Sequence, residues 1–147
     1  MIEIIIGLIV IFLFGSKIYQ IINKYRESYK PIFKFNAKVV TNTKDRKKGL
    51  MYRKKKLNKK EGMLFDFEEP QTISLWMKNT FIPLDAIYFN EDGKIMDLNH
   101  SLKPKSTKSV RSNELCRYVL EVNANTIKNN KMQIGDYVKI NKVKKLK

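Results

Sequence analysis

Alternation of apolar and polar side chains is the feature that most limits what this chain can fold into. It is clearest in residues 72–79, where each side chain would point opposite to its neighbours, as in a half-buried strand. One set would face a core and the other would face away: Ile73, Leu75 and Met77 against Ser74, Trp76 and Lys78. Pro83 follows, and proline cannot donate to a strand ladder. The pattern predicts a central strand over 72–79.

Similar short runs recur along the chain and are separated by glycine, proline and asparagine. Strands are predicted at 33–40, 62–67, 84–89, 94–98, 117–122 and 137–140, and short helices at 44–49 and 125–131. Glu91-Asp92-Gly93 is a hairpin signal between two of these strands. The predicted class is mainly β (α+β), a small antiparallel β-barrel or rolled sheet with one or two short helices, preceded by an N-terminal transmembrane helix.

The N-terminal segment is uniformly apolar. No charged residue occurs from Ile4 to Gly15, and further isoleucines extend the run to Ile22. A helix of this length spans about 28 Å, close to the thickness of a bilayer's hydrocarbon core. A cleaved signal peptide would need a basic start and a small-residue cleavage site, and the chain has neither. We expect residues 1–22 to be an uncleaved membrane anchor.

The organisation predicted from these patterns has four parts. Residues 1–22 form the anchor, 23–32 a polar linker, 33–141 a β-rich domain and 142–147 a basic tail that frays. Lysine and arginine residues follow the anchor and none precedes it, so the positive-inside rule places the globular part in the cytoplasm.

The net charge of +16 is large but unevenly spread. Residues 62–100 carry two Lys/Arg against seven Asp/Glu, so the middle of the chain is acidic. A nucleic-acid protein needs its basic face at the binding site. We therefore expect no nucleic-acid partner and interpret the lysines as a solvated surface. Attachment to anionic lipid or nucleic acid through 44–60 and 139–147 stays an alternative.

The chain offers little to a metal or to covalent chemistry. It has one cysteine, Cys116, and one histidine, His100, which excludes disulfides within the chain and metal centres built on several such ligands. Phosphate-binding loops, dinucleotide fingerprints and hydrolase motifs are absent from the sequence. No cofactor, metal or catalytic residue is predicted.

Polar residues beside the only tryptophan form the candidate ligand-binding site. Its members lie within ten residues of one another: Trp76, Lys78, Asn79, Pro83 and Asp85. A lysine–aspartate pair beside an amide can orient a carbonyl or carboxylate ligand. The same residues can instead be structural, with Trp76 in the core, Asn79 capping backbone groups and Asp85 pairing with Lys78 to fix the turn at Pro83.

A second polar set is assigned to the surface. Arg53, Arg117 and Glu121 are candidates for an exposed ion pair, whose contribution to stability would be small.

Several blocks along the chain together resemble one known family. In order they are Gly49-Leu50-Met51-Tyr52-Arg53, Glu61-Gly62-Met63-Leu64-Phe65, Trp76-Met77-Lys78-Asn79-Thr80, Ile82-Pro83-Leu84-Asp85, Tyr118-Val119-Leu120-Glu121-Val122 and Gly135-Asp136. Their order and spacing over roughly 35–140 resemble the family called domain of unknown function 192. One departure is Asn125, where the family usually has glycine; asparagine tolerates a left-handed backbone.

The resemblance implies a compact β-rich domain, often behind an export signal or membrane anchor. This conflicts with the positive-inside reading, so the side of the membrane on which the domain lies is left open. The family has no assigned activity, so the resemblance transfers no catalytic residue.

Three functions follow as hypotheses. The first is a membrane-anchored, non-catalytic binding module for a small polar ligand, an envelope component or a protein partner. The second is a hydrolase or transferase with Asp85 as base and Lys78 as electrostatic stabiliser. The third is the basic domain that binds anionic lipid or nucleic acid, whose binding would weaken steeply with salt.

Overall fold

The computed structural model of the chain describes residues 14–22, 24 and 30–146. The chain divides into two units, Met1–Pro31 and Ile32–Lys147. In the first unit, residues 14–22 are helical. Within the described residues no helix is long and apolar enough to cross a membrane. Most of the predicted anchor lies in residues 1–13, outside the described residues, so the anchor stays a prediction.

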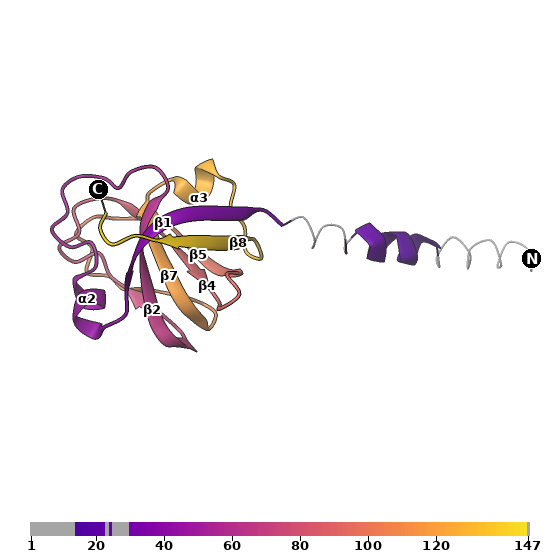
Figure 1. The fold of residues 1–147 in the computed structure, drawn as a ribbon, viewed down its shortest axis with the longest axis horizontal. Coiled ribbons are helices and arrows are strands. Elements are labelled where there is room, and N and C mark those ends of the chain that lie inside the picture. Colours follow the sequence, from indigo (N-terminus) through magenta and orange to yellow (C-terminus); the bar gives the residue numbers. More distant parts are fainter. Residues whose placement is uncertain (1–13, 23, 25–29, 147) are drawn as a thin grey trace, which may run out of the picture. The chain divides into compact units, whose positions relative to one another are not determined.

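The second unit is built on a six-stranded sheet with the strand order β5-β4-β7-β2-β1-β8. The strands of this sheet are β1 (Ile32–Val40), β2 (Glu61–Gln71), β4 (Leu84–Phe89), β5 (Ile95–Leu102), β7 (Cys116–Asn123) and β8 (Tyr137–Lys142). A separate two-stranded ribbon and two short helices complete the unit: β3 (Ser74–Leu75), β6 (Val110–Arg111), α2 (Thr43–Lys48) and α3 (Thr126–Asn129). The predicted mainly β class is confirmed (Figure 1).

The sheet is mixed, whereas an antiparallel one was predicted. β1 runs parallel to both of its neighbours, β2 and β8, and the remaining pairs are antiparallel. The reason lies in the connections, because parallel strands need a long crossover. Residues 41–60, which include α2, carry the chain from the end of β1 back to the level at which β2 begins beside it.

The sheet curls until its two end strands meet. Backbone hydrogen bonds join Ile95 to Asp136 and Val138 to Gly93, each with an N···O distance of 2.8 Å. Gly93 has a φ of 82°, and a Cβ atom there would lie 2.5 Å from the carbonyl oxygen of Val138. Glycine is therefore required where the curl closes. The predicted barrel or rolled sheet is a curled six-stranded half-barrel.

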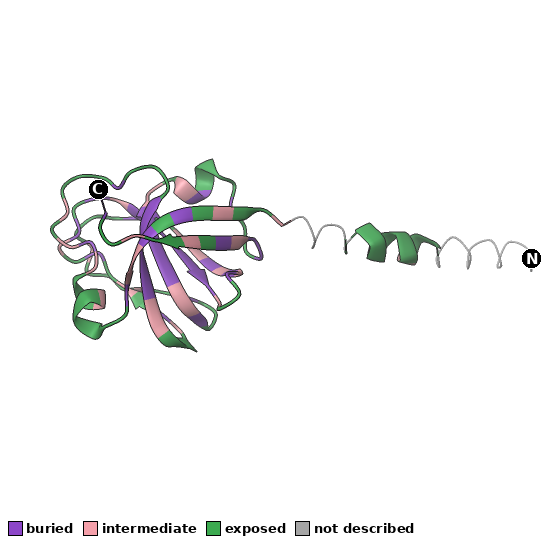
Figure 2. Cartoon of the chain, in the orientation of Figure 1, coloured by how far each residue is buried: buried purple, intermediate pink, exposed green. Residues whose placement is uncertain are grey.

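Each face of the sheet carries its own hydrophobic core. Purple runs along the strands in Figure 2 mark the buried residues. The inner core receives side chains from all six strands of the sheet and from α3: Phe35, Ala37, Leu64, Ile87, Phe89, Ile95, Leu120, Val122, Ile127, Met132 and Val138. The outer core lies between the other face and the loops that cover it: Val40, Leu50, Leu57, Met63, Phe65, Ile73, Met77, Ile82, Leu84, Ala86, Tyr88, Leu102, Cys116, Val119 and Leu146.

The prediction of a long central strand over 72–79 is wrong, although its alternation is right. Only Ser74–Leu75 pair as a strand, with β6. Beyond them Met77 donates its N–H to Ser106 in another loop, and Asn79 has a left-handed φ of 56°. Ile73 and Met77 are nevertheless buried and Leu75 is half-buried, while Ser74 and Trp76 are exposed. Loop contacts therefore bury the apolar set in place of a strand ladder.

Local signals placed the helices well. Asn42 caps α2 through a hydrogen bond from the N–H of Asp45 at 2.8 Å, and Gly49 ends the helix with a φ of 46°. Asn125 adopts a φ of 68° before α3, as expected where the family has glycine. The expected frayed tail is wrong in part, because Leu146 is buried in the outer core and Lys142 belongs to β8.

Candidate functional site

A cavity of about 480 Å³ lies over the outer face of the sheet, between the sheet, α2 and the segment that contains Trp76. Its wall is mostly apolar, with a few hydroxyl and amide groups and a basic rim. The lining residues are Thr43, Arg46, Lys47, Lys48, Gly49, Leu50, Met51, Phe65, Phe67, Gln71, Ser74, Leu75, Trp76, Thr80 and Glu121. An apolar cavity with a few converging polar groups is the usual form of a small-molecule site.

Glu121 is the buried charge-bearing group of this cavity. It lies on β7 between Met63 of β2 and Ala86 of β4, and only 5% of its surface is exposed. Among the described residues its carboxyl has no hydrogen bond or ion pair. In that part of the chain Tyr88 Oη is the one fully covered side-chain polar atom without a partner, so the carboxyl oxygens of Glu121 are not fully covered. Because Glu121 lines the cavity, its carboxyl opens onto it.

Burial raises the pKa of Glu121 from 4.5 to about 8. With so little of the residue exposed, water solvates the carboxylate poorly there, and no cation close to it compensates. A shift of this size corresponds to about 5 kcal/mol of free energy against ionisation in the folded chain. At neutral pH Glu121 is therefore mostly protonated and can donate as well as accept a hydrogen bond.

Trp76 forms one side of the cavity mouth. It is 46% exposed, and the ammonium group of Lys78 lies 5.2 Å from the centroid of its ring. Backbone hydrogen bonds hold the surrounding segment to two other loops, because Tyr52 donates to Asn79 and Lys105 donates to Thr80. A half-exposed aromatic ring in a fixed segment is a suitable wall for a ligand.

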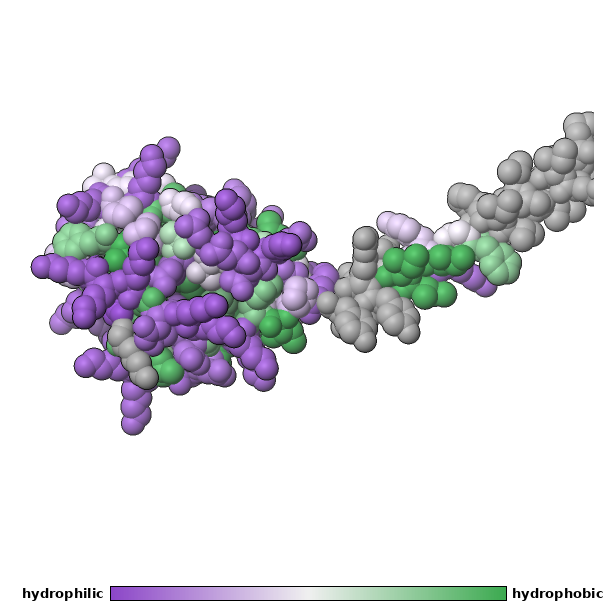
Figure 3. Space-filling view, turned by 90° about the horizontal axis from the view of Figure 1, so that it is seen from above, coloured by the Kyte–Doolittle hydropathy of each residue, from purple (hydrophilic) through white to green (hydrophobic). Residues whose placement is uncertain are grey.

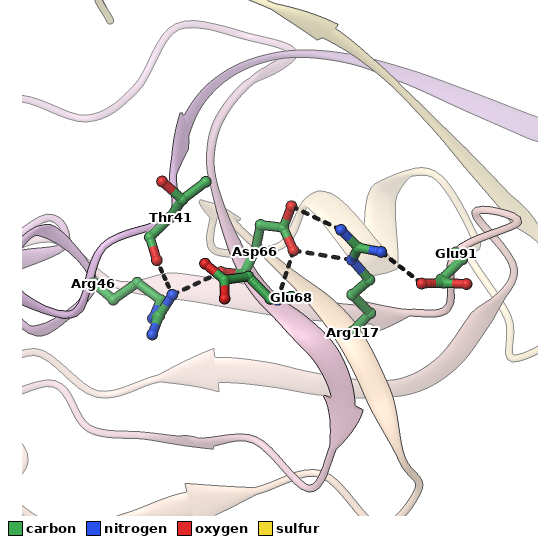
Figure 4. A network of polar contacts seen from close by, with 6 residues as sticks. All are labelled: Thr41, Arg46, Asp66, Glu68, Glu91 and Arg117. Carbon is green, nitrogen blue, oxygen red and sulfur yellow. Dashed lines mark hydrogen bonds and ion pairs between the residues drawn. The ribbon is translucent and has the colours of Figure 1, made fainter.

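Arg46 fixes α2 against the sheet on the other side of the mouth. Its guanidinium donates to the carbonyl groups of Thr41 and Asp66, and it lies 4.9 Å from the ring centroid of Phe67. Figure 4 shows the two hydrogen bonds of Arg46 as part of a network in which the carboxylate of Asp66 pairs with Arg117 at 3.0 Å. Arg46 is thus a structural cation.

Lys47 and Lys48 lie in the last turn of α2 and also line the cavity. In the part of the chain that the structure describes, neither ammonium group has a hydrogen bond or an ion pair. The rim of the cavity therefore carries two free positive charges, while its floor carries an unpartnered carboxyl.

The structure disperses the predicted site residues. Trp76 lines the cavity, and Lys78 packs on its outer side. Asn79 donates its side-chain N–H to the hydroxyl of Tyr52 at 3.0 Å, and Pro83 accepts a backbone hydrogen bond from Ala124 at 3.1 Å. Asn79 and Pro83 have these structural contacts and do not line the cavity.

Asp85 lies away from the cavity. It is completely buried on β4, where it alternates with Leu84 and Ala86 of the outer core and so points to the inner side of the sheet. Its two carboxylate oxygens accept the backbone N–H groups of Ser101 and Ile127, both at 2.9 Å. No ion pair joins Asp85 to Lys78 among the described residues, so the geometry favours the structural interpretation of Asp85.

The expected surface ion pair of Arg53, Arg117 and Glu121 is wrong. Arg117 pairs with Asp66 and with Glu91, at 3.0 and 2.6 Å, while Glu121 is buried on the cavity floor. The strand 117–122 was predicted, but its alternation does not say which face is covered by loops. The signal that could have identified Glu121 is its place among valine and leucine in a strand otherwise free of acids.

Other candidates for chemistry are weaker. Within the described residues no group of three or more His, Cys, Asp and Glu could hold a metal ion. Cys116 is buried, and burial with the nearby Asp97 raises the pKa of its thiol to about 11, which makes it unreactive. A larger cavity of about 600 Å³ lies beside β1, but its buried carboxyl, Glu61, accepts the N–H of Asn58 at 3.2 Å.

Comparisons with known proteins agree with the fold. A solved structure from Sinorhizobium meliloti 1021, described as a candidate transcription regulator, is 38% identical, with a TM-score of 0.66 over 69% of this chain and 78% of that one. A protein of unknown function from Novosphingobium aromaticivorans DSM 12444 is 29% identical, with a TM-score of 0.67 over 70% of this chain and 73% of that one. No functionally curated protein matches the sequence.

The match to a protein family covers most of the chain. The model of the family DUF192, described as "Uncharacterized ACR", matches residues 24–140. This range contains α2, the Trp76 segment and β7, and thus every element that lines the cavity. The chain belongs to the DUF192 family.

Proposed function

We propose that this chain is a non-catalytic binding module that takes a small polar ligand with an apolar part into the cavity between Trp76 and Glu121. The observation that carries the proposal is the Glu121 carboxyl, which is 5% exposed and opens onto the cavity. A buried polar group without a partner costs about 1–3 kcal/mol. Native proteins rarely retain such a group without a functional reason.

The walls support a ligand of mixed character. Leu50, Met51, Phe65 and Leu75 supply apolar surface, and Thr80 supplies a hydroxyl group. A ligand that fills this space gains the hydrophobic free energy of its apolar part and gives Glu121 a hydrogen-bond partner.

Tryptophan fluorescence of the full chain tests the proposal, because Trp76 is the only tryptophan. A panel of small metabolites is titrated while the emission of Trp76 and its quenching by iodide are followed. We expect at least one class of compound to protect Trp76 from quenching by iodide. Glu121→Gln should reduce the affinity for that compound at least tenfold. Lys44→Ala is the matched control, since Lys44 belongs to α2 but does not line the cavity. A panel without any protecting compound would contradict the proposal.

We also propose that residues 1–22 hold the domain at a membrane, on the strength of the uncharged run Ile4–Gly15. The full chain should sediment with membranes and resist extraction by alkaline carbonate. The unit Ile32–Lys147 contains both hydrophobic cores and should stay in the supernatant. Equal extraction of the two chains would contradict the anchor.

An enzyme that uses Glu121 is the second candidate. A carboxyl that stays protonated near neutral pH is in the state of a general acid, and this observation favours the candidate. The pair of Asp85 and Lys78 predicted from the sequence gives the enzyme no support, because Asp85 is buried on the inner side of the sheet and Lys78 is exposed. Turnover of any compound that binds, lost in Glu121→Gln while binding persists, would replace the binding module by an enzyme.

A further inference from the structure

The two ends of the cavity carry ionisable groups of different kinds. The floor holds the unpartnered carboxyl of Glu121, and the rim holds the free ammonium groups of Lys47 and Lys48. Between them the wall is mainly apolar, with Leu50, Phe65 and others. Each end lacks a counter-charge from the described part of the chain.

We propose that the ligand of this cavity is a small zwitterion, whose amine binds the Glu121 carboxyl on the floor and whose carboxylate binds Lys47 and Lys48 at the rim. The inference rests on the proposed function and names its ligand class. A simple amine on the floor would offer no charge to the rim cations, and a simple carboxylate held at the rim would leave Glu121 on the floor unpartnered. A zwitterion with an apolar linker satisfies both ends at once.

Aromatic rings of the cavity wall can also attract the amine of the ligand. Phe65 lies in the outer core beneath the cavity, and Phe67 and Trp76 form parts of its wall. Cations are attracted to aromatic faces, most strongly where water is excluded.

Binding moves a proton, which gives the inference its own readout. The groups beside Glu121 are Met63 and Ala86 on the neighbouring strands and the buried hydroxyl of Tyr88 on β4. The cations of α2 lie at the rim and do not contribute to its pKa. An ammonium group that binds beside the carboxyl favours its ionised form. Because burial keeps Glu121 mostly protonated at pH 7 in the free chain, it then releases up to one proton per ligand.

The experiment is isothermal titration calorimetry of the full chain at pH 7 in buffers that differ in ionisation enthalpy. The probes are ω-amino carboxylates of increasing chain length, each with the alkylamine and the alkylcarboxylate of equal length. At the best length we expect the zwitterion to bind at least tenfold more tightly than either single-charge probe. We also expect it to release close to one proton, whereas the carboxylate releases none.

Variants assign the two ends. Glu121→Gln should reduce zwitterion affinity about tenfold, to that of the carboxylate, and should abolish proton release. Lys47→Ala with Lys48→Ala should reduce it to that of the amine with proton release intact, and Lys44→Ala should change neither.

Two outcomes would overturn the inference. If alkylcarboxylates bind as tightly as zwitterions and protect Trp76 from quenching by iodide, the cavity binds ligands but has no preference for zwitterions. The inference then fails and the proposed function survives. If none of the probes binds, and the metabolite panel also leaves Trp76 unprotected, the proposed function fails together with the inference.

Discussion

Replacing Glu121 by glutamine should stabilise the folded chain near neutral pH. The pKa of Glu121 is raised from 4.5 to about 8 by burial, so the folded state holds a proton that the unfolded state releases. For a raised pKa, stability is complete below the unfolded value and is lost as the pH rises toward the folded value. The affected window therefore runs from about pH 4.5 to pH 8.

The magnitude follows from the width of that window. Each pH unit costs about 1.4 kcal/mol, so at pH 7 the wild-type chain has lost roughly 3 kcal/mol that Glu121→Gln retains. Glutamine has the same shape and stays neutral in both states. The gain should vanish near pH 4, where the glutamate is protonated in the folded and the unfolded chain alike.

Urea unfolding at several pH values between 4 and 8 measures the effect. The quantity of interest is the difference in unfolding free energy between Glu121→Gln and wild type, because contributions from other groups cancel. Glu114→Gln is the matched control, since Glu114 is exposed in the loop just before β7 and should give a difference near zero. A difference for Glu121→Gln that does not change with pH would refute the assignment of Glu121 as a buried, neutral carboxyl.

Three further predictions concern the fold. Gly93→Ala should destabilise by more than the roughly 1–2 kcal/mol of a left-handed backbone, because its Cβ would also meet the carbonyl of Val138; thermal unfolding checks this, and a melting temperature equal to wild type would contradict the closure described. Asp85→Asn should cost about 3 kcal/mol in urea unfolding, because an amide group would face a backbone N–H that the carboxylate now accepts; an unchanged midpoint would favour a functional role for Asp85 over a structural one. The thiol of Cys116, with its pKa raised to about 11, should react with a thiol reagent at pH 8 only after unfolding, and rapid reaction of the native chain would contradict its burial.

Local patterns in the sequence predicted most of the elements. The strand 84–89 lies where its apolar run indicated, and α2 begins and ends at Asn42 and Gly49 as capping rules suggest. These features depend on neighbours along the chain, so the sequence contains the relevant physics. Local patterns could not predict the parallel pairing of β1, because this pairing depends on where a twenty-residue connection returns the chain.

The site was harder to predict because it depends on which face the loops cover. Alternation indicated that Trp76 lies on the side of the segment away from Ile73 and Met77, but a core position stayed open until the structure showed the ring half-exposed. Glu121 was assigned to the surface, because a glutamate in a strand is usually exposed. Only the packing of α2 and the Trp76 segment over β7 removes it from water.

The surface charge has a simpler origin. Hydrophilic side chains dominate the face of the β-rich unit seen in Figure 3, with hydrophobic ones in separate patches. The lysine-rich composition predicted such a solvated surface. Charge alone therefore does not single out a binding face, and the unpartnered lysines of α2 gain significance only from the cavity beside them.

The titration of the Glu121 side chain tests the central claim most directly. Carbon-13 labelling of the glutamate Cδ positions, with Glu121→Gln to assign the signal, follows this one carboxyl by NMR as the pH is raised in the full chain. The account predicts a midpoint of about 8, which falls when a zwitterion fills the cavity. A midpoint near 4.5, indifferent to added ligand, would show that the carboxyl is solvated and would contradict the account.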